Sequence, residues 1–147
     1  MIEYHGWITL RFSDYHVGNK KQEDFKNKLN TFLKTEFPVV LETNIKIGSF
    51  NGMDMLMMNG CHNHRGTDRF YPLQIFRWIS ENGPGSYGLL YIQDDEDRRK
   101  DYADNFRVWV LKRGQLEEKE DTLLSPYIPQ CEKEFDEENP PIDYDSE

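Results

Sequence analysis

The sequence predicts an α+β domain with a mostly antiparallel five-stranded sheet, two helices on one face and an extended C-terminal segment. Two observations support this prediction. Segments with the two-residue alternation of strands and segments with helical periodicity follow one another as strand, helix, two strands, helix, two strands. The first six elements have the order of a split-βαβ unit, whose helices pack together on one face of the sheet.

The first strand and the first helix are indicated by periodicity. Residues 4–12 alternate in the manner of a strand, with Tyr4 and Ile8 on one side and Trp7 on the other. Asn19 and Gln22 have the spacing of a capping box at the start of a helix, and Pro38 would stop that helix. Its apolar face would contain Phe25, Leu29, Phe32, Leu33 and Phe37.

The central strands and the second helix are marked by turn residues. Strands are expected over residues 39–50 and 53–60, because the dipeptide Asn51-Gly52 between them is a strong hairpin signal. A helix is expected over about residues 71–81, with Pro72 in its first turn. The run Asn82-Gly83-Pro84-Gly85 would end it.

The last two predicted strands, residues 87–93 and 106–112, are apolar on both sides. Two helices can cover only one of these faces. The other face must be covered by residues 115–131 or offered to a partner, and self-cover is favoured because monomers rarely expose large apolar patches. We therefore expect the segment around Leu124, Tyr127 and Ile128 to pack on the body.

The length and charge predict one domain followed by a tail. The chain has 147 residues and a formal net charge of −9. Residues 1–116 carry 16 Lys and Arg against 15 Asp and Glu, whereas residues 117–147 carry 2 against 12. We expect a single domain over residues 1–131 and a mobile acidic tail over residues 132–147, because such a segment buries too little apolar surface to offset ordering entropy.

The same features bear on compartment and partners. There is no basic region followed by an apolar stretch at the start and no long apolar run, so neither an export signal nor a membrane span is expected. Cys61 and Cys131 are too few for a disulfide framework, which favours a cytoplasmic protein. An acidic chain repels nucleic acid and anionic membranes and attracts a basic protein partner.

The candidate partner-binding residues are acidic and aromatic. One hairpin loop gathers many carboxylates, although Arg98, Arg99 and Lys100 interrupt them and could neutralise part of the cluster. Large aromatic side chains on the strands, Trp7 among them, are candidates for interface anchors. The residues we assign to partner binding are Asp94, Asp95, Glu96, Asp97, Asp101, Asp104, Tyr87, Tyr91 and Trp109.

Catalytic and metal-binding patterns are weak. The run Cys61-His62-Asn63-His64, with Asp68 nearby, contains zinc ligand types, but no second ligand pair follows at finger or ribbon spacing. The acidic run from Asp94 to Asp97 lacks the EF-hand pattern. We therefore expect no enzyme, no cofactor and no bound metal. A small metal-dependent enzyme using the His62 and His64 region stays open as an alternative, as does a nucleic-acid module with bases stacked on an open sheet face.

Several segments also show a family resemblance. They are EYHGWITLR at residues 3–11, GSYGLLYI at residues 85–92 running into the acidic residues from Asp94 to Asp97, FRVWVLKRG at residues 106–114, and Leu124-Ser125-Pro126 with Pro129. Together they resemble the immunity protein 7 family of bacterial polymorphic toxin systems. The resemblance implies a cytoplasmic α+β protein that binds the toxic C-terminal domain of a neighbouring toxin and blocks it, without catalysis. It does not imply which toxin, and it does not cover the acidic end after Glu132.

The expected function is therefore an immunity protein that neutralises the C-terminal toxic domain of a cognate toxin. A nuclease is one target that suits this chain, because nuclease sites are basic and Asp and Glu can stand in for phosphate. The oligomeric state stays open, since an edge strand such as residues 39–50 or 106–112 could pair with its copy.

Overall fold

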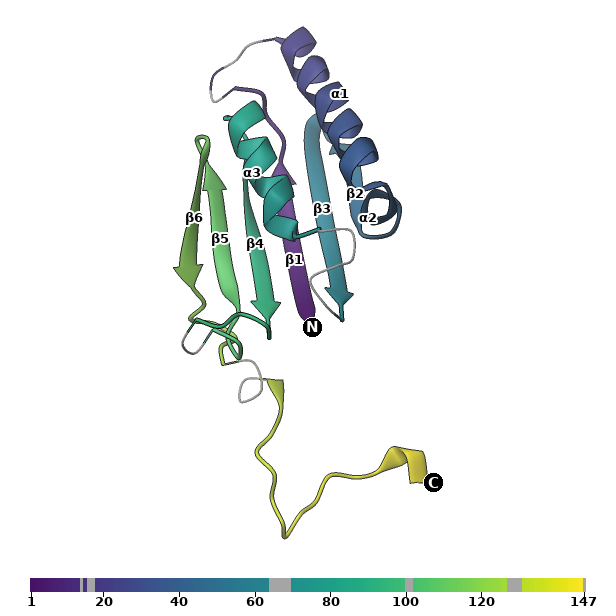
Figure 1. Cartoon of the computed structure of the whole chain (residues 1–147), viewed down its shortest axis with the longest axis vertical. Coiled ribbons are helices and arrows are strands. Elements are labelled where there is room, and N and C mark those ends of the chain that lie inside the picture. The colour runs from purple at the N-terminus through teal and green to yellow at the C-terminus, as the bar shows by residue number, and fades with distance from the viewer. Residues whose placement is uncertain (14, 16–17, 64–69, 100–101, 127–130, 147) are drawn as a thin grey trace.

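One open antiparallel sheet with helices on one face makes up the body of the protein in a computed structural model of the chain (Figure 1). The structure describes residues 1–13, 15, 18–63, 70–99, 102–126 and 131–146. Within these residues the sheet has six strands in the order β2-β3-β1-β4-β5-β6. The strands are β1 (Ile2–Thr9), β2 (Ile45–Phe50), β3 (Met53–His62), β4 (Tyr87–Asp94), β5 (Arg107–Lys112) and β6 (Gln115–Glu120).

The topology confirms the split-βαβ prediction. β1 lies between β3 and β4 and is antiparallel to both, and β2 pairs with the outer side of β3. The sheet nevertheless has one strand more than predicted. β6 is a polar segment whose only apolar residue, Leu116, lies opposite Leu111, so periodicity did not mark it. The turn Arg113-Gly114, with φ angles of 49° and 71°, joins β5 to β6 as a hairpin.

The core lies between the sheet and the two long helices, α1 (Asn19–Glu36) and α3 (Pro72–Asn82). Both helices lie on the same face of the sheet (Figure 1). They bury the stripes Phe25, Leu29 and Leu33 from α1 and Ile75, Phe76 and Ile79 from α3. Gly6 on β1 allows this close packing, because a Cβ there would lie 3.1–3.2 Å from side-chain atoms of Met58, Leu90 and Phe76.

The predicted strand over residues 39–50 is wrong in its first half. Residues Pro38–Thr43 form a short helix, α2, and the strand begins only at Ile45. Pro38 stands in the first turn of α2, where its missing N–H is not needed, and this turn buries Val40. Tertiary packing thus overrides the strand preference of the two adjacent valines.

The predicted capping box at Asn19 is also wrong. Gly18, at φ 77°, precedes α1, and no side chain among the described residues caps the helix. The Gln22 side chain instead bonds across to the chain after β1, accepting from the Phe12 N–H at 2.8 Å and donating to the Leu10 carbonyl at 2.8 Å. The hairpin at Asn51-Gly52 is confirmed, with both residues at positive φ.

The segment predicted to cover the second face of the sheet, residues 115–131, begins as a strand and is described up to residue 126 and at Cys131. Residues 115–120 form the edge strand β6, and residues 121–126 turn beneath the lower end of β5 (Figure 1). Tyr127, Ile128 and Pro129 lie outside the described residues. From Cys131 to Asp145 every residue is exposed, and the ribbon runs away from the sheet.

Candidate functional site

The sheet face opposite the helices, which we call the open face, carries an apolar surface. Residues that lie opposite one another in adjacent antiparallel strands share a face, so the register identifies its members. Trp7 and Tyr87 are 45% and 38% exposed, and the other members are half-buried. The residues that form this apolar surface are Trp7 on β1, Met55 and Met57 on β3, Tyr87, Leu89 and Tyr91 on β4, and Val108 and Val110 on β5.

A hollow of about 600 Å³ lies on the open face, toward the end of the sheet where β1 begins. Its lining combines Trp7, Leu89 and Tyr91 from the sheet with Leu123 and Leu124 from the segment after β6. Glu3, His5 and Asn59 form a polar edge, and Gly6, Phe106 and Cys131 complete the lining. The hollow can therefore hold an apolar group with a polar or charged neighbour.

A network of hydrogen bonds holds one wall of the hollow in place. The Asp121 carboxylate accepts from the Tyr91 hydroxyl, from the Leu123 N–H at 2.9 Å and from the Leu124 N–H at 3.0 Å. It also accepts from the Ser125 hydroxyl at 2.8 Å, and that hydroxyl accepts from the Phe106 N–H. Asp121 thus joins the sheet to the turn that carries Leu123 and Leu124.

The pKa shifts in this network follow from burial and hydrogen bonding. Burial, together with the hydrogen bond to Asp121, raises the pKa of Tyr91 to about 12. Burial also disfavours the charged Asp121, but the hydrogen bonds it accepts outweigh burial and lower the pKa of this carboxyl group. Asp121 is therefore ionised and Tyr91 neutral at physiological pH.

His5 and Glu3 form the polar edge of the hollow. The ring nitrogens of His5 lie 2.8 Å from the Asn59 side-chain oxygen and 3.0 Å from the Glu3 carboxylate. Burial works against the charged imidazolium, but both contacts favour it, and the pKa of His5 is raised as a result. Protonation of His5 changes the charge at this edge.

Part of the predicted acidic loop has a structural role. Asp94 is only 4% exposed, and its carboxylate accepts hydrogen bonds from the Glu96 N–H and the Tyr71 hydroxyl. The N-terminal ammonium group donates to Asp95. Asp104 is exposed, and Asp101 lies outside the described residues.

Arg99 organises the rest of this loop. Its guanidinium donates to Asp97 and, from the other side, to Glu118 on β6. These contacts raise the pKa of Arg99. The Tyr102 ring contacts two guanidinium groups, and its centroid is 4.3 Å from that of Arg99 and 3.9 Å from that of Arg107. The loop is therefore held by its own charges, as the interrupting basic residues suggested, and a smaller part of the carboxylate charge is presented outward.

The predicted aromatic anchors separate onto two faces. Tyr87 and Tyr91 lie on the open face, and the Tyr87 ring meets the Trp7 ring edge to face at 6.3 Å between centroids. Trp109 lies opposite Leu90, on the helix-covered face, where it packs against the core. Sequence reasoning did not select Met55, Met57, Val108 or Val110, although the alternation within their strands was the signal that could have found them.

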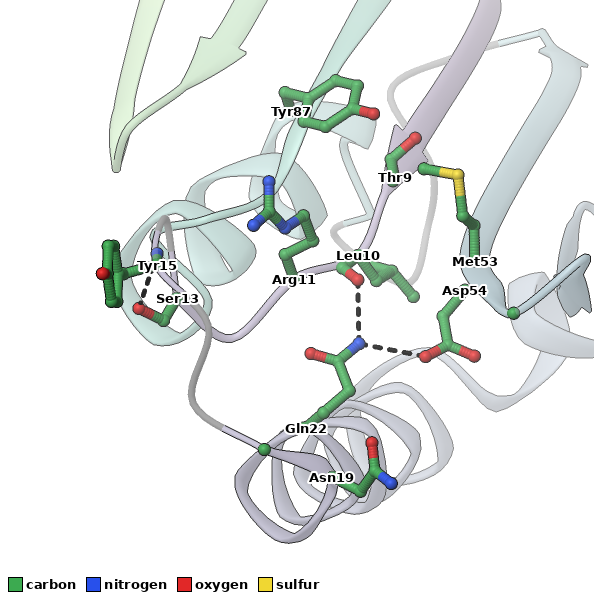
Figure 2. Close-up of a pocket in the computed structure, with 12 residues that line it drawn as sticks. Thr9, Leu10, Arg11, Ser13, Tyr15, Asn19, Gln22, Met53, Asp54 and Tyr87 are labelled. Carbon is green, nitrogen blue, oxygen red and sulfur yellow. Dashed lines mark hydrogen bonds between the residues drawn. The ribbon is translucent and has the colours of Figure 1, made fainter.

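A second cavity of about 280 Å³ lies at the other end of β1 (Figure 2). Gln22 donates to the Leu10 carbonyl and to the Asp54 carboxylate, and Lys26 pairs with Asp54 at 3.0 Å. Arg11 and Tyr87 line the cavity above these groups. The polar groups of this cavity bond to one another. These contacts attach α1 and the β2-β3 hairpin to the chain at the end of β1.

The weak metal pattern is divided between faces. The His62 Nε2 atom lies 3.0 Å from the Tyr4 hydroxyl oxygen, and the His62 ring stacks on the Tyr4 ring. Cys61 lies opposite Glu3 in the strand register and therefore belongs to the open face. His64 and Asp68 lie outside the described residues. Among the residues that are described, no three His, Cys, Asp or Glu side chains gather in a group that could hold a metal ion.

Comparison with known proteins identifies a family. A family model described as Immunity protein 7 matches residues 1–133. Searches of curated proteins and of solved structures find no match. In the described part of the chain, none of the helices has the length and apolar character needed to cross a membrane.

Proposed function

Because this chain belongs to the immunity protein 7 family, we propose that it binds the toxic C-terminal domain of a cognate bacterial toxin and blocks its activity. The family match over residues 1–133 is the observation that carries this proposal. The chain acts by binding and performs no catalysis of its own. The binding takes place in the cytoplasm, where a toxin that has entered the cell would act.

The open face supports a binding role. Its exposed aromatic residues, Trp7 and Tyr87, are of the type that supplies much of the energy at protein interfaces. A monomer rarely leaves such a surface uncovered without a function for it. We place the toxin contact here, with the outward carboxylates of the loop, such as Asp104, at its margin.

The charge of the chain supports a basic target, and a nuclease is the class that fits best. A net charge of −9 speeds the approach of a positive partner. Nuclease sites are positive because they hold phosphate, so an acidic protein can bind there and exclude the substrate.

Co-expression tests the proposed function. The toxic domain encoded beside this gene is expressed in a bacterial host with and without this chain. Growth arrest by the toxic domain alone, growth with the pair, and co-purification of the two proteins are expected. An unrelated toxin whose arrest is not relieved is the control. Continued arrest in the presence of the folded chain would contradict the proposal.

One observation favours a second candidate, a nucleic-acid module. Trp7, Tyr87 and Tyr91 lie on an open sheet face, which is where split-βαβ domains stack RNA bases. The acidic net charge opposes this function, because such domains need a basic surface. Retardation of single-stranded RNA in a gel at moderate salt would support the second candidate, and free migration of the RNA would exclude it.

A further inference from the structure

The hollow on the open face has the shape and chemistry of an anchor site. We infer that it holds one apolar side chain of the toxic domain, and that the toxin surface around this side chain is basic. This inference rests on the proposed function and adds the place and the chemistry of the contact.

The apolar part of the inference follows from the lining. Trp7, Leu89 and Tyr91 come from adjacent strands of a rigid sheet, and Leu124, 45% exposed, stands at the side of the hollow. An apolar side chain placed among them would lose its contact with water on all sides. This burial of apolar surface is the main source of affinity at an interface hot spot.

The wall of the hollow is already formed in the free protein. Asp121 fixes the turn that carries Leu123 and Leu124 through two backbone hydrogen bonds, and the Tyr91 hydroxyl fixes Asp121 to the sheet. Little ordering entropy is then lost on binding, and this favours affinity.

The charge around the hollow selects a basic partner. Glu3 lies at its edge, and Cys131, where the acidic tail begins, is part of its lining. Residues 132–147, which follow Cys131 directly, contain 8 acidic residues and one lysine. The ribbon of this tail runs away from the sheet (Figure 1). Because the tail starts at the lining of the hollow, a toxin whose apolar side chain occupies the hollow would lie near the carboxylates of the tail and of Glu3. Basic groups around that side chain would therefore be attracted.

The same charge argues against a second copy of this chain as the occupant. Two copies meeting through the open face would bring two acidic tails and two net charges of −9 together. Like charges at an interface cost free energy, whereas a basic toxin gains from the same arrangement.

The test measures binding kinetics of full-length variants with the toxic domain encoded beside the gene. Trp7→Ala and Leu124→Ala remove parts of the hollow, and Val39→Ala, an exposed apolar residue of α2, is the matched control. We expect each hollow variant to weaken binding about tenfold or more, mainly through faster dissociation, and the control to bind like wild type.

A second pair of variants tests the charge. Glu132→Gln, Glu134→Gln and Glu137→Gln together remove three charges from the tail, and Glu36→Gln, Glu42→Gln and Glu81→Gln remove three exposed charges from the helix side. The tail variant is expected to slow association and to flatten its salt dependence more than the helix-side variant does.

The outcomes separate the inference from the function on which it rests. Wild-type affinity in both hollow variants would overturn the anchor site, and equal kinetics in the two charge variants would overturn the basic surround. Self-association of wild type that Trp7→Ala abolishes would assign the hollow to a second copy. A wild-type protein that neither binds nor neutralises the toxic domain would instead contradict the proposed function.

Discussion

The Tyr91 hydroxyl donates a hydrogen bond to the Asp121 carboxylate, and this contact ties the centre of the open face to the segment that follows β6. Tyr91 belongs to β4, and Asp121 is the first residue after β6. The ring of Tyr91 also packs on Phe106, with 5.3 Å between centroids. One side chain thus contributes to the apolar surface and holds the wall beside it.

Removal of the Asp121 carboxylate is expected to destabilise the fold and to loosen this wall. Asp121→Ala leaves the partly buried Tyr91 hydroxyl and the backbone N–H groups of Leu123 and Leu124 without their acceptor, at a cost of about 1–3 kcal/mol. Urea unfolding measures the change. Asp136→Ala is the control, because Asp136 accepts similar local hydrogen bonds in the exposed tail and its loss should leave the unfolding transition almost unchanged. Equal costs would show that the Asp121 network does not hold the wall.

His5 is expected to titrate above its ordinary value of 6.5. A raised pKa in the folded state means that the stabilisation from protonated His5 is complete below about pH 6.5 and is lost as the pH rises through the folded value. NMR titration of the His5 ring measures this pKa directly. Glu3→Gln should lower it by removing the charged contact, whereas Glu23→Gln on α1 should leave it unchanged. An unaltered His5 titration in Glu3→Gln would contradict the assigned cause.

Gly88 is expected to tolerate no side chain. A Cβ at this position would collide with the Trp7 carbonyl oxygen and lie 2.8 Å from the Ile8 Cα, and both are backbone atoms that cannot move aside. Gly88→Ala should therefore cost about 3 kcal/mol or more. Gly48→Ala is the matched control, because its Cβ would meet only the Phe50 ring, which can move. Thermal unfolding compares the two, and a similar loss of melting temperature in both would refute the prediction.

Charge reversal in the acidic loop is expected to slow association with the toxic domain. Glu96→Lys and Asp104→Lys change exposed positions, whereas Asp94 and Asp97 are excluded because they hold the loop together. Rim charges act mainly on the association rate, so the dissociation rate should change little. Stopped-flow measurements at low and high salt provide the test. Unchanged association at low salt would remove the loop from the interface.

The acidic tail is expected to be mobile in the free protein. Its apolar residues Phe135, Ile142 and Tyr144 are all exposed, so little burial offsets the entropy of ordering it. Hydrogen exchange of the amides of residues 132–146 should be as fast as in an unstructured peptide, and amides of β1 should be protected. Slow exchange in the tail would mean that it packs in solution.

Local sequence determined much of the fold. The alternation in β1 and β4, the Asn51-Gly52 turn and Pro72 at the start of α3 each act within a few residues, and the structure contains each of these elements. The bounds of β4 and α3 lie close to the predicted ones, whereas β1 covers Ile2–Thr9 and not residues 4–12. The order of the elements then allowed the split-βαβ topology to be predicted. The charge asymmetry of the chain is likewise a property of sequence alone.

The tertiary structure decided which surface is available. Alternation shows that a strand has two faces but not which face the helices cover, so Tyr91 and Trp109 were equivalent by sequence and lie on opposite sides in the fold. Asp94 likewise reads as an exposed loop carboxylate, yet it is buried by groups distant in sequence such as Tyr71. β6 forms because Leu116 and its neighbours pair with β5. The wall of the hollow forms because the Tyr91 hydroxyl donates a hydrogen bond to Asp121. The contacts of Asp94 with Tyr71 and of Asp121 with Tyr91 join residues far apart in the chain, and their energies depend on packing that no local pattern encodes.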